Sequence, residues 1–133
     1  MVMRTLAASV VALGSLWLSA LAAEPSSIGY PTVAAALDAL RKDPQAHFST
    51  QDGWTVVSAT ENGNPVVWSF TPEGHPAHPA AVKRTAVHEK DGGWSMEMAV
   101  QCGGTKAACD KLVEDFKELN ERMKESLRGH HGA

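Results

Sequence analysis

The sequence predicts a small α+β domain: an N-terminal helix, an antiparallel β-meander of about four strands and a C-terminal helix. Three observations lead to this fold class. Apolar residues recur with helical spacing near residues 32–43 and 105–127, and they alternate with a period of two between residues 54 and 102. Short glycine-containing turns separate the alternating segments. Both helices are expected to pack on one face of the sheet.

The first 23 residues have the order of an export signal. Arg4 precedes an apolar run from Leu6 to Leu21, and small residues suited to cleavage follow the run. The run is shorter than the roughly 20 residues that span a bilayer. We therefore expect residues 1–23 to be a cleaved signal peptide and residues 24–133 to form one domain. The mature protein would be periplasmic or secreted, with membrane contact only during export.

The first helix of the domain is predicted to begin after Thr32, whose side chain can cap it. Val33, Leu37 and Leu40 fall on one face and form a stripe that would be buried. Pro44 ends the helix, because the residue before a proline avoids the helical region.

The strands are predicted from alternation and turn signals. The pair Asn62-Gly63 suits the positive φ angles of a hairpin turn. A fifth, shorter segment at residues 47–50 carries only a weak strand pattern. Apolar and polar residues alternate most regularly in the last strand, which indicates one dry and one wet face. The four predicted strands cover residues 54–59, 65–71, 81–89 and 94–102.

The last helix is predicted from Thr105 to about residue 127, with Phe116 at the centre of its buried stripe. Charged residues occupy the opposite face. The expected buried stripe consists of Ala108, Leu112, Phe116, Leu119 and Met123.

Composition excludes some functions and leaves others open. The chain has 12 Lys and Arg against 15 Asp and Glu, so bulk positive charge cannot drive nucleic-acid binding. The sequence contains no nucleophile elbow, phosphate-binding glycine loop or HExxH zinc motif. We therefore assign no catalytic residues and no cofactor, and we expect a protein that is not an enzyme. After the binding of a partner and the binding of a metal, a small hydrolase with a non-standard active site is the third possible function.

The two cysteines are expected to form a structural disulfide. Cys102 ends the last strand and Cys109 lies in the first turn of the last helix. Cysteines of exported proteins usually pair, whereas redox-active dithiols are typically two residues apart.

The segment 71–79 is the most unusual stretch of the chain. His75 and His78 each precede a proline, which favours extended or polyproline II geometry with both imidazoles on one side. Such a pair suits a rigid surface loop, recognition of a partner, or a zinc or copper site. A metal would need further ligands, for which His47, His88 and the C-terminal histidine pair are candidates.

Lys83 and Arg84 form a small basic spot just after this loop. They belong either to a solvated strand face or to a site where Arg84 and the loop imidazoles hold an anion. The candidate partner-binding residues are therefore His75, His78, Lys83 and Arg84.

Three of the four tryptophans lie at or within predicted strands: Trp54, Trp68 and Trp94. Packing in the core is the expected role of all three. An exposed aromatic platform for binding is the alternative.

The block from Val67 to Pro79, followed by Val82-Lys83-Arg84, resembles an uncharacterised family of small exported proteins of Gram-negative bacteria with the core segment W-S-F-T-P-x-G-H-P-A-H-P. The resemblance implies a periplasmic or secreted single domain and carries over no catalytic or binding residues. The sequence thus predicts a periplasmic domain that binds a protein or cell-envelope component through the His-Pro loop. The alternative is a periplasmic protein that binds zinc or copper through His75 and His78.

Overall fold

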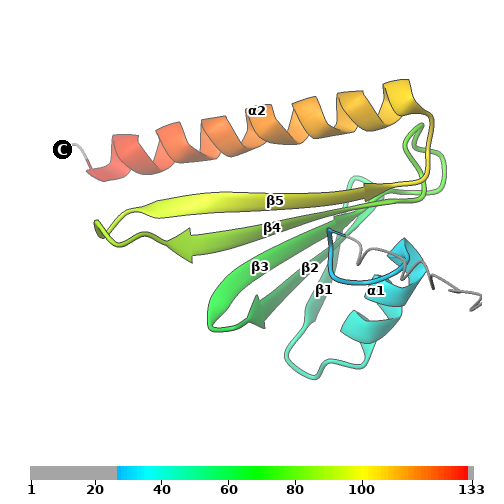
Figure 1. The fold of residues 1–133 in the computed structure, drawn as a ribbon, viewed down its shortest axis with the longest axis horizontal. Coiled ribbons are helices and arrows are strands. Elements are labelled where there is room, and N and C mark those ends of the chain that lie inside the picture. Colours follow the sequence, from blue (N-terminus) through cyan, green and yellow to red (C-terminus); the bar gives the residue numbers. More distant parts are fainter. Residues whose placement is uncertain (1–26, 132–133) are drawn as a thin grey trace, which may run out of the picture.

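The structure, a computed structural model, describes residues 27–131, and the predicted signal peptide lies outside them. The fold class is α+β, with an antiparallel sheet and two helices (Figure 1). The sheet has five strands, so the prediction of about four was too low. In chain order the elements are α1 (Val33–Arg41), β1 (His47–Gln51), β2 (Trp54–Glu61), β3 (Asn64–Phe70), β4 (Ala80–His88), β5 (Trp94–Cys102) and α2 (Lys106–His131).

The strands form a meander in which each strand pairs with the next along the chain, in the order β1-β2-β3-β4-β5. Two-residue turns with positive φ at both positions close the first two hairpins, at Asp52-Gly53 and Asn62-Gly63. All five residues of β1 are exposed, so this strand lacks an alternating apolar pattern. For this reason the sequence has only a weak strand pattern at residues 47–50, where the structure has the complete strand β1.

The two helices pack on opposite faces of the sheet, which corrects the prediction that both share one face. Trp68 and Phe70 of β3 are buried on the side of α1, whereas Val82 of β4 is buried on the side of α2. The apolar residues of neighbouring strands thus point to different faces, so each face needs its own cover. Figure 1 shows α2 running alongside β5, with α1 near the opposite edge of the sheet.

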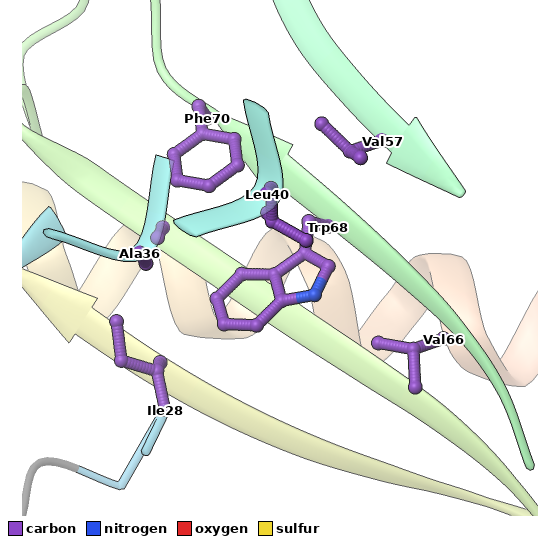
Figure 2. Packing of buried hydrophobic residues seen from close by; sticks show 8 residues of the cluster. Ile28, Ala36, Leu40, Val57, Val66, Trp68 and Phe70 are labelled. Carbon is purple, nitrogen blue, oxygen red and sulfur yellow. The ribbon is translucent and has the colours of Figure 1, made fainter. Parts of the chain in front are cut away.

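The core under α1 is centred on Trp68, whose side chain is 2% exposed. Its ring stacks on Phe70 with centroids 5.8 Å apart and lies 6.0 Å from the ring of Tyr30. Leu40 of α1 packs against the same cluster (Figure 2). The core prediction is therefore confirmed for Trp68, but Trp94 is 58% exposed.

Thr32 caps α1, because its Oγ1 accepts a hydrogen bond from the backbone N–H of Ala35 at 3.0 Å. We expect Thr32→Ala to lower the free energy of unfolding by about 1 kcal/mol, the usual cost of losing such a cap. Urea denaturation would measure it, with Ser126→Ala on the exposed face of α2 as the control. Equal midpoints for the two variants would contradict the capping role.

A disulfide joins the end of β5 to the first turn of α2, which confirms the predicted pairing of Cys102 with Cys109. The corner beside it is tightly packed. The N–H of Gly103 donates to the carbonyl of Pro79 at 2.8 Å, and a Cβ on Gly104 would come within 2.7 Å of the Ala77 backbone. The loop 71–79 is therefore fastened to the start of α2.

The disulfide indicates an oxidising, non-cytoplasmic compartment. Within residues 27–131, neither helix is long and apolar enough to cross a membrane.

Candidate functional site

A groove of about 460 Å³ lies between α2 and the face of the sheet that α2 covers only in part. The side chains of α2 pack over β4 and β5, which leaves the same face of β2 and β3 open beside the helix. We call this feature the α2 groove. Its lining residues are Gln51, Asp52, Trp54, Val56, Ser58, Val67, Ser69, Arg84, Phe116 and Leu119.

Two aromatic side chains line the groove from opposite elements. Trp54 is the first residue of β2, directly after the Asp52-Gly53 turn, and Phe116 projects from α2. Their ring centroids are 5.8 Å apart at an interplanar angle of 57°. Both side chains are half-buried. The groove therefore presents aromatic surface from the sheet and from the helix at one place.

Arg84 of β4 carries the positive charge of the groove. Its guanidinium carbon lies 5.3 Å from the centroid of the Phe116 ring, a favourable cation–π distance. Its Nη1 donates to Oδ1 of Asn120 across 3.5 Å, the outer limit for a hydrogen bond, and to Sδ of Met123 at 3.4 Å. No carboxylate among residues 27–126 forms an ion pair with Arg84.

The Nε atom of Arg84 is buried and has no hydrogen-bond partner in the described part of the chain. Loss of hydration in this half-buried position lowers the pKa of Arg84 from its usual value. A buried donor without a partner and a partly buried charge without a counter-charge both cost free energy. Among the described residues, Arg84 is therefore the one side chain with a buried polar atom that lacks a hydrogen-bond partner.

Lys83 lies on the opposite face of the sheet from Arg84, because neighbouring residues of a strand alternate. Its Nζ forms an ion pair with Glu61 at 2.7 Å and lies 5.3 Å from the centroid of the Trp68 ring. Lys83 thus has its own partners under the α1 side of the sheet. The basic spot predicted from the sequence is divided between two faces.

The loop 71–79 forms two successive turns instead of the predicted polyproline II segment. The N–H of His75 donates to the carbonyl of Pro72, and the N–H of His78 donates to the carbonyl of His75, each at 3.0 Å. Polyproline II helices have no such internal hydrogen bonds. The prediction that both imidazoles lie on one side rested on polyproline II geometry, and the loop does not adopt that geometry.

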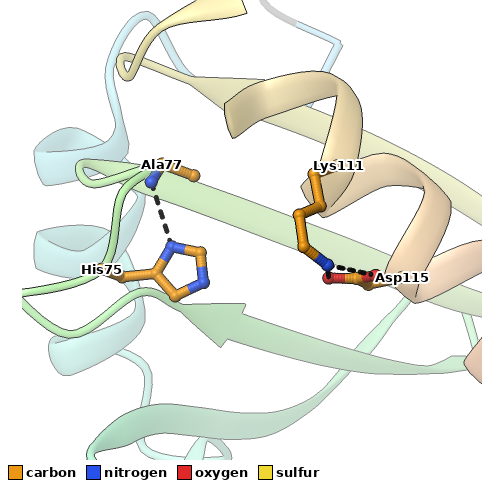
Figure 3. A network of polar contacts seen from close by, with 4 residues as sticks. All are labelled: His75, Ala77, Lys111 and Asp115. Atoms are coloured by element: carbon orange, nitrogen blue, oxygen red, sulfur yellow. Dashed lines mark hydrogen bonds and ion pairs between the residues drawn. The ribbon is translucent and has the colours of Figure 1, made fainter. Parts of the chain in front are cut away.

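Each imidazole has a role within the loop. Nδ1 of His75 accepts from the N–H of Ala77 at 3.0 Å (Figure 3), and its ring meets that of Trp54 edge-on with centroids 5.1 Å apart. Nδ1 of His78 lies 3.1 Å from Oγ1 of Thr71. His75 therefore braces an aromatic residue of the α2 groove, whereas His78 is exposed and bonds to the start of the loop.

The predicted metal site at His75 and His78 has no further ligand near it in the described chain. No group of three or more His, Cys, Asp or Glu residues among residues 27–126 is placed to hold a metal ion, and the side chains of the C-terminal histidine pair lie outside this range. His47 opens β1, and the ring of His88 packs edge-on against Trp94 with centroids 4.8 Å apart. Metal binding stays a prediction of the sequence.

The structure thus brings together two of the four candidate residues, His75 and Arg84, through the rings of Trp54 and Phe116. Trp54 and Phe116 were predicted as core residues and were missed as site residues. One sequence signal pointed to the groove: Arg84 follows Val82 on one face of the strand, at a position where a cation interrupts the apolar residues Ala80, Val82 and Ala86. On α2, Asn120 follows Phe116 by one helical turn and continues that stripe with a polar group.

No family model, curated protein or solved structure matches the chain. The chemistry of the α2 groove is therefore the basis for a functional proposal.

Proposed function

We propose that this chain is an exported, non-enzymatic binding domain that holds a partner protein or a component of the cell envelope in the α2 groove. The observation that carries the proposal is Arg84, a half-buried cation with an unpartnered Nε and no carboxylate partner among the described residues. A ligand with a negatively charged group would supply the counter-charge that this side chain lacks.

The aromatic walls support the same proposal. Aromatic residues and arginine are the residue types that most often contribute large binding energies at protein interfaces. Trp54 and Phe116 are both half-buried, so each keeps surface that a ligand can cover. The groove volume of about 460 Å³ falls within the range of ordinary ligand sites.

The proposed location is the periplasm or the exterior of the cell. The disulfide between Cys102 and Cys109 supports an oxidising compartment, and the order of residues 1–23 supports export. The resemblance to small exported proteins of Gram-negative bacteria agrees with both. The partner would accordingly be a molecule of the envelope.

We narrow the proposed working surface to part of the stretch from His75 to Arg84. His75 would act through Trp54, which it contacts, and Arg84 would contact the ligand directly. Lys83 has its own ion pair on the other face, and His78 is bonded to Thr71. We therefore place the working surface in the α2 groove instead of along the whole segment from His75 to Arg84.

Capture from detergent-solubilised cell envelope, with the oxidised protein immobilised, tests this proposal. We expect Arg84→Met to lower the capture of the retained component at least about tenfold, because methionine keeps the apolar stem and removes the charge. Lys83→Met is the matched control: it removes the same charge from the next residue, on the opposite face. Capture by this control should match the wild type.

Thermal unfolding of both variants completes the test. Arg84→Met should retain a folded domain, because its guanidinium has only weak partners in the described chain. Capture that survives Arg84→Met, or that falls equally in both variants, would overturn the proposal that the α2 groove is the working surface.

A further inference from the structure

We propose that the ligand of the α2 groove is the free carboxyl end of a peptide chain with an apolar last side chain, and that Arg84 pairs with its terminal carboxylate. This inference rests on the proposed function, because it names the chemistry of what the same groove would bind. It follows from four properties of the groove: the unpaired charge of Arg84, the balance of charge, the apolar walls and the volume.

The unpaired charge of Arg84 suits a carboxylate. A guanidinium offers pairs of parallel N–H groups, and a planar carboxylate can accept two of them at once. Nη1 is directed to Asn120 and Met123 on α2. Nε has no hydrogen-bond partner among the described residues but is itself buried, so the group left for a ligand is Nη2, for which the described residues provide no partner either. A carboxylate that pairs with Nη2 would supply the counter-charge that Arg84 lacks among the described residues.

The balance of charge in the groove favours a single negative charge over a phosphate or a polyanion. Arg84 is the one cation among the ten lining residues, and Asp52 at the exposed turn is the one carboxylate. Sites that recognise phosphate usually combine several cations or backbone N–H groups. Asp52 would repel a second negative charge on the ligand. A terminal carboxylate carries one negative charge, which Arg84 can pair with, and the lining has no second cation for a further negative charge.

The walls and floor of the groove suit the rest of a peptide end. Trp54 and Phe116 provide aromatic surface, and Val56 and Leu119 extend it with aliphatic groups. Burial of an apolar last side chain against this surface is favourable in proportion to the area covered. Ser58 and Ser69 lie on the same lining, where hydroxyl groups can donate to or accept from peptide groups.

The volume of the groove favours a chain end over a long segment laid through it. About 460 Å³ matches a ligand of the size of a few residues. At a chain end, the carboxylate and the last side chain leave the same carbon atom. One residue can therefore reach Arg84 and the aromatic rings together. An acidic residue inside a chain would need room for the backbone on both sides.

Calorimetric titration with defined peptides tests the inference. The probes are acetylated tetrapeptides ending in phenylalanine or leucine, each with a free carboxyl end or with a C-terminal amide. We expect the free acids to bind the wild type at least about tenfold more tightly than the amides, the usual effect of a charge-assisted pair in a partly buried site. This preference should vanish in Arg84→Met and persist in Lys83→Met.

Two further probes identify other sources of negative charge. The first is a tetrapeptide amide with an internal glutamate, and the second is vesicles that contain phosphatidylglycerol. If either probe binds with the Arg84 dependence expected of the free acids while the free acids do not bind, the inference is overturned. Equal affinity of acids and amides would overturn it as well.

The outcome separates this inference from the proposed function. If no peptide binds but envelope capture still depends on Arg84, then the α2 groove is a binding site for another chemistry and only the peptide assignment fails. If envelope capture does not depend on Arg84, the proposed function fails whatever the peptides do.

Discussion

Replacement of Trp68 by alanine is expected to lower the free energy of unfolding by about 3–5 kcal/mol, the range for large aromatic side chains removed from a core. Trp68 is 2% exposed and is the largest side chain of the cluster beneath α1. Its removal would take contacts from Phe70 and Tyr30, and from the ammonium group of Lys83. Since small domains are stable by only about 5–15 kcal/mol, this is a large fraction of the total.

Trp94→Ala is the control for this prediction, because it makes the same chemical change at a side chain that is 58% exposed. We expect it to cost about 1 kcal/mol or less, mainly through the lost contact with His88. Guanidinium denaturation followed by far-UV circular dichroism would measure both variants. Similar midpoints would show that the cluster beneath α1 is not the main core of the domain.

Leu112→Ala is expected to have the next largest effect, a loss of about 2–5 kcal/mol. Leu112 is 2% exposed, and no other side chain in the described part of α2, residues 106–126, is classed as buried. It packs with Ala77, Ala80 and Val82 on the side of the sheet that α2 covers. Without the Leu112 side chain, the disulfide in the first turn of α2 would be the strongest remaining attachment of this helix to the sheet.

Leu119→Ala removes the same atoms from α2 at a half-buried position that lines the groove. We expect it to cost clearly less stability than Leu112→Ala, because less apolar surface returns to water. The pair of denaturation midpoints therefore measures where α2 is anchored. A larger loss from Leu119→Ala would contradict the burial pattern of the helix.

The sequence allowed much of this fold to be predicted, because local patterns report local structure. The alternation from Trp94 to Cys102 predicted β5 with the bounds it has, and Asn62-Gly63 predicted the turn between β2 and β3. The cap at Thr32 and the disulfide are also local features, decided by residues within a few positions of each other. Each of them depends on one turn, one cap or one short loop.

The arrangement of the helices depended on information that no single element carries. Strand β3 shows its apolar residues Val66, Trp68 and Phe70 on one face, and β5 shows Met98 and Val100 on one face. Whether two such faces point the same way depends on the register of the strands between them. For this reason the prediction of both helices on one face was wrong although the elements themselves were largely right.

The candidate site was half predicted for a similar reason. Arg84 and His75 were singled out by residue type, but the groove that joins them is made by Trp54 and Phe116 from distant segments. Phe116 was expected at the centre of the buried stripe of α2. It lies at the margin of that stripe, because α2 covers β4 and β5 and leaves β2 and β3 open on this face.

Because Lys83 and Arg84 are adjacent on β4, the register of this strand determines which of the two cations faces the α2 groove. Each cation has surroundings that the other lacks: Glu61 and Trp68 on one face, Phe116 and Asn120 on the other. A shift of one residue would exchange the two faces of β4. Lys83 would then line the groove, where its ammonium group lacks the planar arrangement of N–H donors of a guanidinium. The guanidinium of Arg84 would lie over Trp68.

The loop 71–79 opposes such a shift, because it fixes the position of the first residue of β4. Thr71 bonds to both the N–H and the carbonyl of Ala80, and Pro79 bonds to Gly103 beside the disulfide, so the first residue of β4 is held from two sides. Insertions or deletions in this loop should therefore be tolerated far less than its surface position suggests. The unusual His-Pro segment thus has a structural role apart from any ligand. It fixes the register of β4, and this register places Lys83 and Arg84 on opposite faces of the sheet.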